Sequence, residues 1–251
     1  MSPSSEETNA SEAQLSFRDE LSELYRTSPL PNGELMTNLG LYIRASSLVK
    51  LLVLNDLYTR IKDLPGVIVE FGTWWGQNMV LFENLRAIYE PFNKTRTIIG
   101  FDTFEGYHGF TERDEEGAVF AEGEYSVGAN YQEYLEKLLA VHEGNNVLGH
   151  IRGRHSLIAG DVTDTAPRYF ADHPELTVAL AYFDMGLYAP TKAALDAIKP
   201  HLVAGSVLLL DEFSWSEAKG EAIAFRETFD TDGYTIESSR FTPMRAIVTI
   251  R

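Results

Sequence analysis

Short apolar runs alternate along the chain with longer segments in which apolar residues recur at helical spacing. The run 67–71 (VIVEF) is apolar at every position except Glu70, and residues 75–89 after it have a helical pattern. The strands predicted farther along are 97–102, 157–159, 178–184 and 206–211, and the predicted helices are 130–141, 191–198 and 216–229. Repeated strand–helix units predict a parallel sheet with helices on both faces.

Two further strands, 234–237 and 246–250, are predicted to close the chain with no helix between them. Strands joined in this way form an antiparallel edge of a sheet. We therefore expect the α/β class, as a doubly wound, mostly parallel, seven-stranded sheet with an antiparallel C-terminal hairpin and extra helices before the first strand.

The residues before the first strand have a different pattern. Residues 1–15 are polar and acidic and are predicted to form a disordered tail. Ser16 and Asp19 resemble a capping box that starts a short helix, and apolar residues at helical spacing predict a long helix over 41–64. Residues 16–251 are thus expected to form one domain, with N-terminal helices over 16–64 and a lid loop, rich in glycine and acidic residues, over about 104–128.

The charge balance and the lack of cysteine narrow the possible partners. The chain has 21 Lys and Arg against 37 Asp and Glu, and its net charge of -16 repels a phosphate backbone, so no nucleic-acid partner is expected. The absence of cysteine excludes disulfides, cysteine nucleophiles and thiolate zinc sites. No apolar run approaches the roughly 18–20 residues that span a bilayer, so we expect a cytoplasmic protein without a membrane partner.

The first three predicted strands all end in residues suited to a nucleotide-like ligand. The turn after the first strand contains Gly72 and Gly76, which allow close approach to the backbone, although their spacing differs from the dinucleotide-binding G-x-G-x-x-G pattern. The second strand ends at Asp102, where an acid can accept hydrogen bonds from ribose hydroxyls, and the third ends at Gly160-Asp161. A role as helix N-caps is the alternative for Asp102 and Asp161.

A second group of acids follows the two longest apolar strands. Asp184 ends one strand, and Asp211 with Glu212 ends the next. If these strands are neighbours, about 4.8 Å apart, the three carboxylates meet and repel one another unless a cation or protons intervene. Mg²⁺ or Ca²⁺ suits such an all-oxygen cluster and would lower the pKa of a substrate hydroxyl. Alternatively, one acid caps a helix and another pairs with Arg or Lys.

The segment EFGTWWG, residues 70–76, resembles the first motif of class I S-adenosylmethionine-dependent methyltransferases. The resemblance implies the Rossmann-like fold of that class, with Asp102 holding the adenosine ribose and Asp161 bordering the adenine. Arg44 could hold the methionine carboxylate through its fork of donors, or it could be structural. The residues assigned to the cofactor are Arg44, Glu70, Gly72, Thr73, Gly76, Asp102, Thr103, Phe104, Gly160, Asp161 and Val162.

From about residue 35 to the C-terminus, the chain is similar to the macrocin-type sugar O-methyltransferases. The segments that carry this similarity are 101–106, 160–165, 183–188 and 210–212. In that family the equivalent acidic residues bind magnesium and the first of them is a candidate base. This chain departs from the family twice, because Gly186 replaces an aspartate of the first motif and Glu212 replaces the second aspartate of the last motif.

The resemblance implies methyl transfer from S-adenosylmethionine to a hydroxyl of a sugar or sugar nucleotide, such as a TDP-deoxyhexose, in natural-product biosynthesis. Asp184 or His108, in the loop after the second strand, would take the hydroxyl proton, although His108 could equally be an exposed histidine without a role. The alternatives are a NAD-dependent sugar-nucleotide oxidoreductase and a non-catalytic nucleotide-binding protein of the same fold. The N-terminal helices could form the interface of a homo-oligomer.

Overall fold

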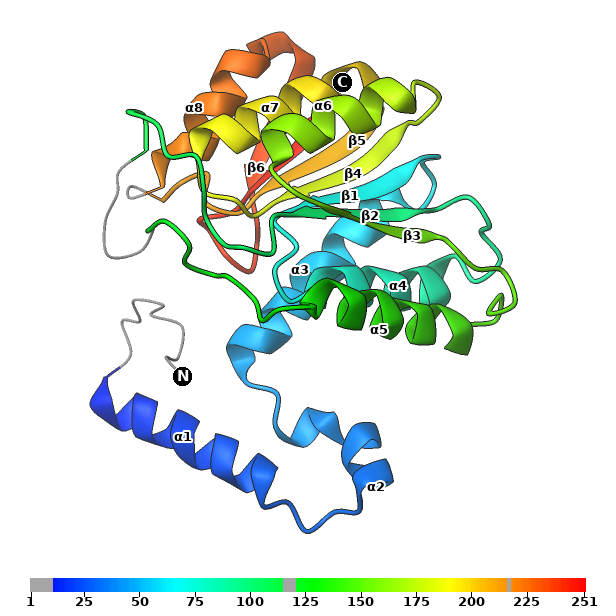
Figure 1. Cartoon of the computed structure of the whole chain (residues 1–251), viewed down its shortest axis with the longest axis vertical. Helices are drawn as coiled ribbons and strands as arrows, with labels where there is room; N and C mark the ends of the chain where they lie inside the picture. Colours follow the sequence, from blue (N-terminus) through cyan, green and yellow to red (C-terminus); the bar gives the residue numbers. More distant parts are fainter. Residues whose placement is uncertain (1–10, 115–120, 216–217) are drawn as a thin grey trace. The chain divides into compact units, whose positions relative to one another are not determined.

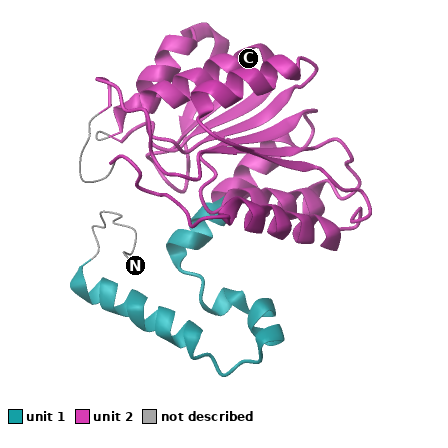
Figure 2. Ribbon diagram, in the orientation of Figure 1, with its two compact units in different colours: residues 1–52 teal, residues 53–251 magenta. Residues whose placement is uncertain are grey.

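A seven-stranded sheet forms the centre of the larger of two units in this computed structural model, which describes residues 11–114, 121–215 and 218–251. The units are Met1–Leu52 and Val53–Arg251 (Figure 2). The strand order is β3-β2-β1-β4-β5-β7-β6, and only the pairs that involve β7 are antiparallel. The strands are β1 (Val67–Phe71), β2 (Ile98–Asp102), β3 (His155–Ala159), β4 (Val178–Phe183), β5 (Leu202–Leu210), β6 (Tyr234–Ser238) and β7 (Ala246–Ile250). This arrangement confirms the predicted fold class.

Helices cover both faces of the sheet (Figure 1). One face carries α4 (Gln77–Tyr89), α5 (Tyr131–Asn145) and part of α3 (Ala45–Ile61). The other carries α6 (Val162–Asp172), α7 (Tyr188–Ile198) and α8 (Lys219–Thr228). None of the described helices has both the length and the apolar character that crossing a bilayer requires.

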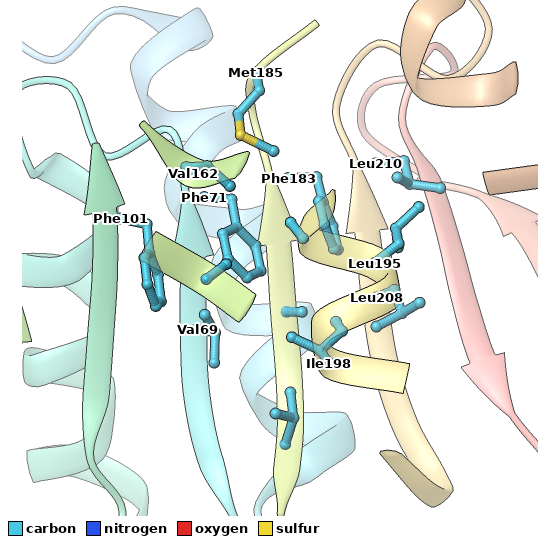
Figure 3. Close-up of a cluster of buried hydrophobic side chains, with 14 of the residues drawn as sticks. Val69, Phe71, Phe101, Val162, Phe183, Met185, Leu195, Ile198, Leu208 and Leu210 are labelled. Atoms are coloured by element: carbon cyan, nitrogen blue, oxygen red, sulfur yellow. The ribbon is translucent and has the colours of Figure 1, made fainter. Parts of the chain in front are cut away.

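The core beneath α6, α7 and α8 is built from side chains of the central strands (Figure 3). Phe71 of β1 stacks between Phe101 of β2 and Phe183 of β4, with ring centroids 5.1 and 5.0 Å away. Each of these rings is fully buried, which stabilises the fold by about 1.5–3 kcal/mol per side chain. Because all three rings lie at or next to the carboxyl ends of their strands, this packing fixes the sheet edge that carries the predicted site residues.

Helix α6 was missed by the sequence analysis, which placed no helix between the third and fourth strands. The helix contains Pro167, a residue that removes a backbone donor and usually ends a helix. Asp161 caps its start, and Ala166 and Phe170 pack into the core. Tertiary packing therefore maintains a helix that the local sequence disfavours.

The N-terminal unit also differs from the prediction. Helix α1 (Glu12–Arg26) begins at Glu12 rather than at residue 16, because Ser11 and Gln14, not Ser16 and Asp19, form the reciprocal capping box. Residues 12–15 of the predicted tail are thus helical, while 1–10 lie outside the described residues. The remaining short elements are α2 (Asn32–Thr37) and the 3₁₀ turns Leu39–Leu41, Lys199–His201 and Thr231–Gly233.

Candidate active site

The turn between β1 and α4 packs closely against the end of β4. Gly72 has φ 89°, and a Cβ there would overlap the carbonyl oxygen of Asp184 and lie 2.8 Å from its carbonyl carbon. Gly76 has φ 74° and packs against the side chain of Leu135. Both glycines are therefore required by the fold itself, in addition to the ligand approach for which the sequence analysis selected them. Trp74, between them, also has a positive φ of 47°, which costs a residue with a side chain about 1–2 kcal/mol.

Asp102 joins this turn to the loop that follows β2. Its Oδ2 accepts a hydrogen bond from the backbone N–H of Trp74 (2.7 Å), and its Oδ1 accepts one from Phe104 (2.6 Å). Burial raises the pKa of Asp102, and the backbone donors oppose that rise. A carboxylate has about four lone-pair sites, so room remains for further donors. Asp102 binds loop amides and does not cap a helix.

Asp161, by contrast, is a helix N-cap. Its Oδ1 accepts hydrogen bonds from the backbone N–H and the hydroxyl of Thr163, both at 2.8 Å. Gly160 donates its N–H to the carbonyl oxygen of Asp102 (2.9 Å), which brings the ends of β3 and β2 together, and Val162 is buried in the core. The capping alternative therefore describes Asp161, and its contact with a cofactor stays a prediction.

The other residues predicted to hold the cofactor occupy several environments. Glu70 is buried on β1 and accepts a hydrogen bond from Asn78 in the first turn of α4 (2.7 Å). Thr73 is buried in the turn, and the Thr103 hydroxyl donates to the carbonyl oxygen of Gly106 (2.8 Å). Arg44 belongs to the N-terminal unit, and its predicted role remains a prediction.

The structure brings Asp184, Asp211 and Glu212 together, and we call these three residues the acidic trio. Strands β4 and β5 are parallel neighbours in the register Phe183↔Leu210, so the residue after each strand reaches the same edge. One carboxylate oxygen from each member lies within 4.8 Å of the others. This meeting was expected if the two strands are neighbours, and the pairing of β4 with β5 meets that condition.

Asp211 is neutralised by a partner that the sequence analysis left open. The guanidinium of Arg245, just before β7, spans both carboxylate oxygens, with Nη2 3.1 Å from Oδ2 and Nε in contact with Oδ1. The Tyr182 hydroxyl donates to the same Oδ1 at 2.7 Å. The alternative in which one acid pairs with arginine thus holds for Asp211.

Glu212 is buried among other carboxylates. Burial raises its pKa well above the ordinary value, and the negative charges of Glu221, Asp184 and Asp211 raise it further. Its Oε2 is buried and finds no N–H or hydroxyl donor among the residues that the structure describes, and its carboxyl group hydrogen-bonds to that of Glu221 when it holds a proton. A buried oxygen of this kind is costly unless a proton or a cation reaches it.

A fourth carboxylate, Glu221 on α8, was not identified from the sequence. It is fully buried, and burial is the main cause that raises its pKa to about 8. Its oxygens accept hydrogen bonds from the backbone N–H groups of Met185 (3.4 Å) and Glu212 (3.2 Å). The signal was present, because Glu221 falls on the buried helical stripe that includes Ala224, Phe225 and Thr228.

Tyr107, rather than its neighbour His108, is the loop residue in the electric field of the acids. Burial raises the pKa of the Tyr107 hydroxyl, and the charges of Glu212 and Asp184 add to that rise. His108 is exposed, and its Nδ1 lies 2.7 Å from Oε1 of Glu122, a hydrogen bond that raises its pKa. Sequence reasoning favoured histidine because its ordinary pKa suits proton transfer, and it assigned no role to the tyrosine.

The predicted lid loop is anchored on both sides of residues 115–120, which lie outside the described residues. Tyr107 exchanges backbone hydrogen bonds with Gly123 and Glu124 (2.8 and 2.9 Å). Asp114 accepts the backbone N–H of Tyr188 at the start of α7 (2.7 Å), and Arg113 lies 4.4 Å above the Tyr188 ring. These contacts attach the described parts of the loop to the helix that follows Asp184.

A family model of the methyltransferase domain matches residues 69–213, which include the glycine turn, Asp102 and the acidic trio. The fold and this match define the chain as a member of the class I S-adenosylmethionine-dependent methyltransferases, and it is an O-methyltransferase. The prediction of this class from residues 70–76 is confirmed.

Two solved structures of CalS11, a calicheamicin methyltransferase, match the chain over nearly its whole length. One is 38% identical, has a TM-score of 0.92 and is matched over 96% of this chain and 94% of that one. The other, an apo structure described as a TDP-rhamnose 3′-O-methyltransferase of calicheamicin biosynthesis, is 36% identical with a TM-score of 0.84 and 96% coverage of both chains. The motifs of this chain also resemble that enzyme, and these matches confirm the resemblance.

More distant structures share the fold alone. The O-methyltransferase NovP is 18% identical, with a TM-score of 0.55 over 80% of this chain and 79% of that one. The search of curated proteins gave no match.

Proposed function

We propose that the protein transfers a methyl group from S-adenosylmethionine to a hydroxyl of a sugar, such as a TDP-deoxyhexose, in natural-product biosynthesis. The observation that carries the proposal is the contact between the glycine turn at Gly72 and the backbone of Asp184. It makes the turn assigned to the methyl donor adjacent to the acidic trio assigned to the acceptor. The identity of 38% with the calicheamicin methyltransferase supports a sugar acceptor.

The cofactor side of the site has the donor and acceptor groups that the proposal needs. The lone-pair capacity of Asp102 that is not used by the backbone donors Trp74, Phe104 and Thr73 would accept a ribose hydroxyl. Glu70 and Thr73 lie on either side of Gly72 and would contact the methionine moiety. Asp161 and Val162 follow β3 and would border the adenine.

The acidic trio has the composition of a site for Mg²⁺, or for Ca²⁺. Its donors are all oxygens, and one oxygen from each residue lies within 4.8 Å of the others, which suits a hard divalent cation. Without a cation, the Glu212 carboxyl shares a hydrogen bond with Glu221. A divalent cation held there would lower the pKa of a sugar hydroxyl. Both carboxylate oxygens of Asp211 already accept hydrogen bonds from Arg245. We therefore propose Asp184 and Glu212 as the principal ligands of the cation and Asp211 as a weaker one.

The remaining chemistry belongs to the residues of the chain. The hydroxyl oxygen attacks the methyl carbon, the new C–O bond forms as the C–S bond breaks, and S-adenosylhomocysteine leaves neutral. Asp184 takes the hydroxyl proton, and Tyr107 orients the acceptor beside it. The pairing of His108 with Glu122 at the surface favours Asp184 over His108 as the base.

Incubation with labelled S-adenosylmethionine and a panel of TDP-sugars and glycosides, with and without EDTA, tests the proposal. We expect label on a sugar hydroxyl and loss of transfer with EDTA, restored by added Mg²⁺. Binding of S-adenosylmethionine without transfer to any sugar in the panel would contradict the proposed acceptor.

We also retain the proposal of a homo-oligomer. The N-terminal unit exposes large apolar side chains, notably Phe17, Met36 and Leu41. Light scattering coupled to size exclusion would measure the mass in solution, and a monomeric mass would contradict this proposal.

A further inference from the structure

Glu221 connects the two strand ends that carry the acidic trio. Its Oε1 accepts the backbone N–H of Met185, which follows Asp184 directly, and its Oε2 accepts the backbone N–H of Glu212. The carboxylate therefore contacts the chain just beyond β4 and just beyond β5. Both of its oxygens accept a backbone N–H, and its carboxyl group also hydrogen-bonds to the side chain of Glu212. Glu221 therefore acts on the trio through the backbone of both strand ends and directly on Glu212.

The position of Glu221 is fixed by the packing of α8. Gly220, the preceding residue, lies so close to the start of α7 that a Cβ would overlap the backbone nitrogen of Tyr188 and lie 2.6 Å from Oδ1 of Asp114. On the same helix, Ala224 and Phe225 are fully buried in the core. The first turn of α8 can shift only if α7 and the end of β4 shift with it, so the carboxylate is held on a rigid element.

We propose that Glu221 is a positioning residue that sets the separation and orientation of Asp184 and Glu212. This inference rests on the proposed function, in which these two side chains hold a divalent cation. Residues that orient metal ligands from behind typically change metal affinity by about 10- to 100-fold when they are replaced. Glu221 has three features of such a residue: complete burial, two backbone partners, and a place outside the three described carboxylates whose oxygens lie within 4.8 Å of one another.

Glu221→Gln tests the inference with little change in size. The amide nitrogen of glutamine only donates, so one of the two backbone N–H groups loses its acceptor. Glu221→Asp keeps the carboxyl group but is one methylene shorter, so it cannot reach both N–H groups. Glu227→Gln is the matched control, because Glu227 lies on the same helix but is exposed and pairs with Arg113 and Tyr188.

Three measurements are made on the full chain. NMR hydrogen exchange in EDTA follows the amides of Met185 and Glu212, titration with Mn²⁺ alone gives metal affinity, and calorimetry gives the affinity for S-adenosylmethionine. In Glu221→Gln and Glu221→Asp we expect at least one of the two amides to exchange about tenfold faster and Mn²⁺ to bind about tenfold more weakly. The cofactor affinity should stay within about twofold and so report an intact fold. Glu227→Gln should match the wild type in all three measurements.

Other outcomes overturn the inference. Unchanged exchange of both amides in Glu221→Gln would show that the carboxylate does not hold the strand ends. Wild-type Mn²⁺ affinity in Glu221→Asp, with weak binding in Glu221→Gln, would show that charge rather than position matters. If the wild-type protein transfers methyl groups but does not bind Mn²⁺, the role of Glu221 in metal binding is refuted. If it binds Mn²⁺ but methylates no sugar, the proposed acceptor is refuted, and the exchange of the two amides then decides the inference.

Discussion

Arg245 and Asp211 form a bidentate ion pair at the carboxyl end of β5, with Nη2 of Arg245 3.1 Å from Oδ2 of Asp211. Their side chains are only 17% and 15% exposed. The pair explains how four acids can gather at one end of β4 and β5. One acid is permanently compensated by arginine, and the buried Glu212 and Glu221, whose pKa values are raised, tend to keep protons when no cation is present.

Replacement of Arg245 by glutamine should therefore destabilise the protein strongly in EDTA and less so with Mg²⁺. Loss of one partner of a buried pair leaves an uncompensated charge, and the expected cost in the free energy of unfolding is about 3 kcal/mol. Urea denaturation with and without Mg²⁺ measures both effects. Arg240→Gln is the control, because Arg240 is 66% exposed, pairs with Asp56 and should contribute less than about 1 kcal/mol. Equal stability of the two variants would contradict this role of Arg245.

Asp184→Asn should reduce turnover far more than it reduces cofactor affinity. Loss of a general base typically lowers the rate by about 10²- to 10⁴-fold, while the cofactor turn is left intact. Single-turnover rates with labelled cofactor, together with calorimetric binding, separate the two quantities. Asp196→Asn, on the surface of α7, serves as the control. Equal losses of turnover and of cofactor affinity would argue that Asp184 binds the cofactor rather than acts as the base.

Asp102→Asn should weaken S-adenosylmethionine binding by about tenfold or more, since hydrogen bonds to a charged group contribute about 1.5–3 kcal/mol each. Asp161→Asn provides the comparison, because asparagine is as good an N-cap as aspartate and can still accept a hydrogen bond from the adenine amino group. Calorimetry should find the affinity of Asp161→Asn within about threefold of the wild type. A larger loss for Asp161→Asn than for Asp102→Asn would reverse the assignment of the ribose carboxylate.

The parts of the site that the sequence predicted are those that depend on neighbouring strands. Parallel strands end at one edge, so Asp184 and Asp211 could be paired from the apolar pattern alone. The bounds of β1 and β7 also agree with the prediction, because β1 lies between two glycines and β7 lies between two arginines. Helix α6 was missed because Pro167 is locally unfavourable and only packing compensates for it.

The contacts that other residues make with the acidic trio could not be predicted in the same way. Arg245 precedes an antiparallel strand, Glu221 lies on a helix, and Tyr107 lies in a loop, so each reaches the trio only through tertiary packing. His108 was preferred to Tyr107 on its chemistry, but side-chain direction in a loop has no periodic signal in the sequence. The acids at the strand ends could thus be predicted, and the helical stripe of α8 marks Glu221 as buried, but the contacts that Arg245, Glu221 and Tyr107 make with the trio could not be predicted.

His155, on β3 and far from the trio in sequence, should give the protein a dependence of stability on pH. Burial lowers the pKa of His155 from 6.5, although the charges of Glu143 and Glu83 oppose this. The unfolded histidine takes up a proton as the pH falls through 6.5 but the folded one resists, so its contribution to stability is present above that pH and is lost below it. Urea midpoints at about pH 7.5 and about pH 5.5 should differ more for the wild type than for His155→Gln. A larger difference for the variant would contradict a neutral, buried His155.

Gly72→Ala should damage the cofactor turn and the acidic trio together. An alanine at position 72 would have to keep a φ of 89°, and its Cβ would overlap the backbone of Asp184. That backbone can move only together with the end of β4. We expect a loss of about 2 kcal/mol or more in the free energy of unfolding, since overpacking and a left-handed backbone each cost about 1 kcal/mol or more. Gly128→Ala is the matched control, because nothing lies within 4 Å of a Cβ at that position. Titrations should show weaker binding of both S-adenosylmethionine and Mn²⁺ by Gly72→Ala, and unchanged binding of both by Gly128→Ala. If only cofactor binding weakened, the turn and Asp184 would be mechanically independent, and the adjacency of donor and acceptor on which the proposed reaction depends would lose its structural basis.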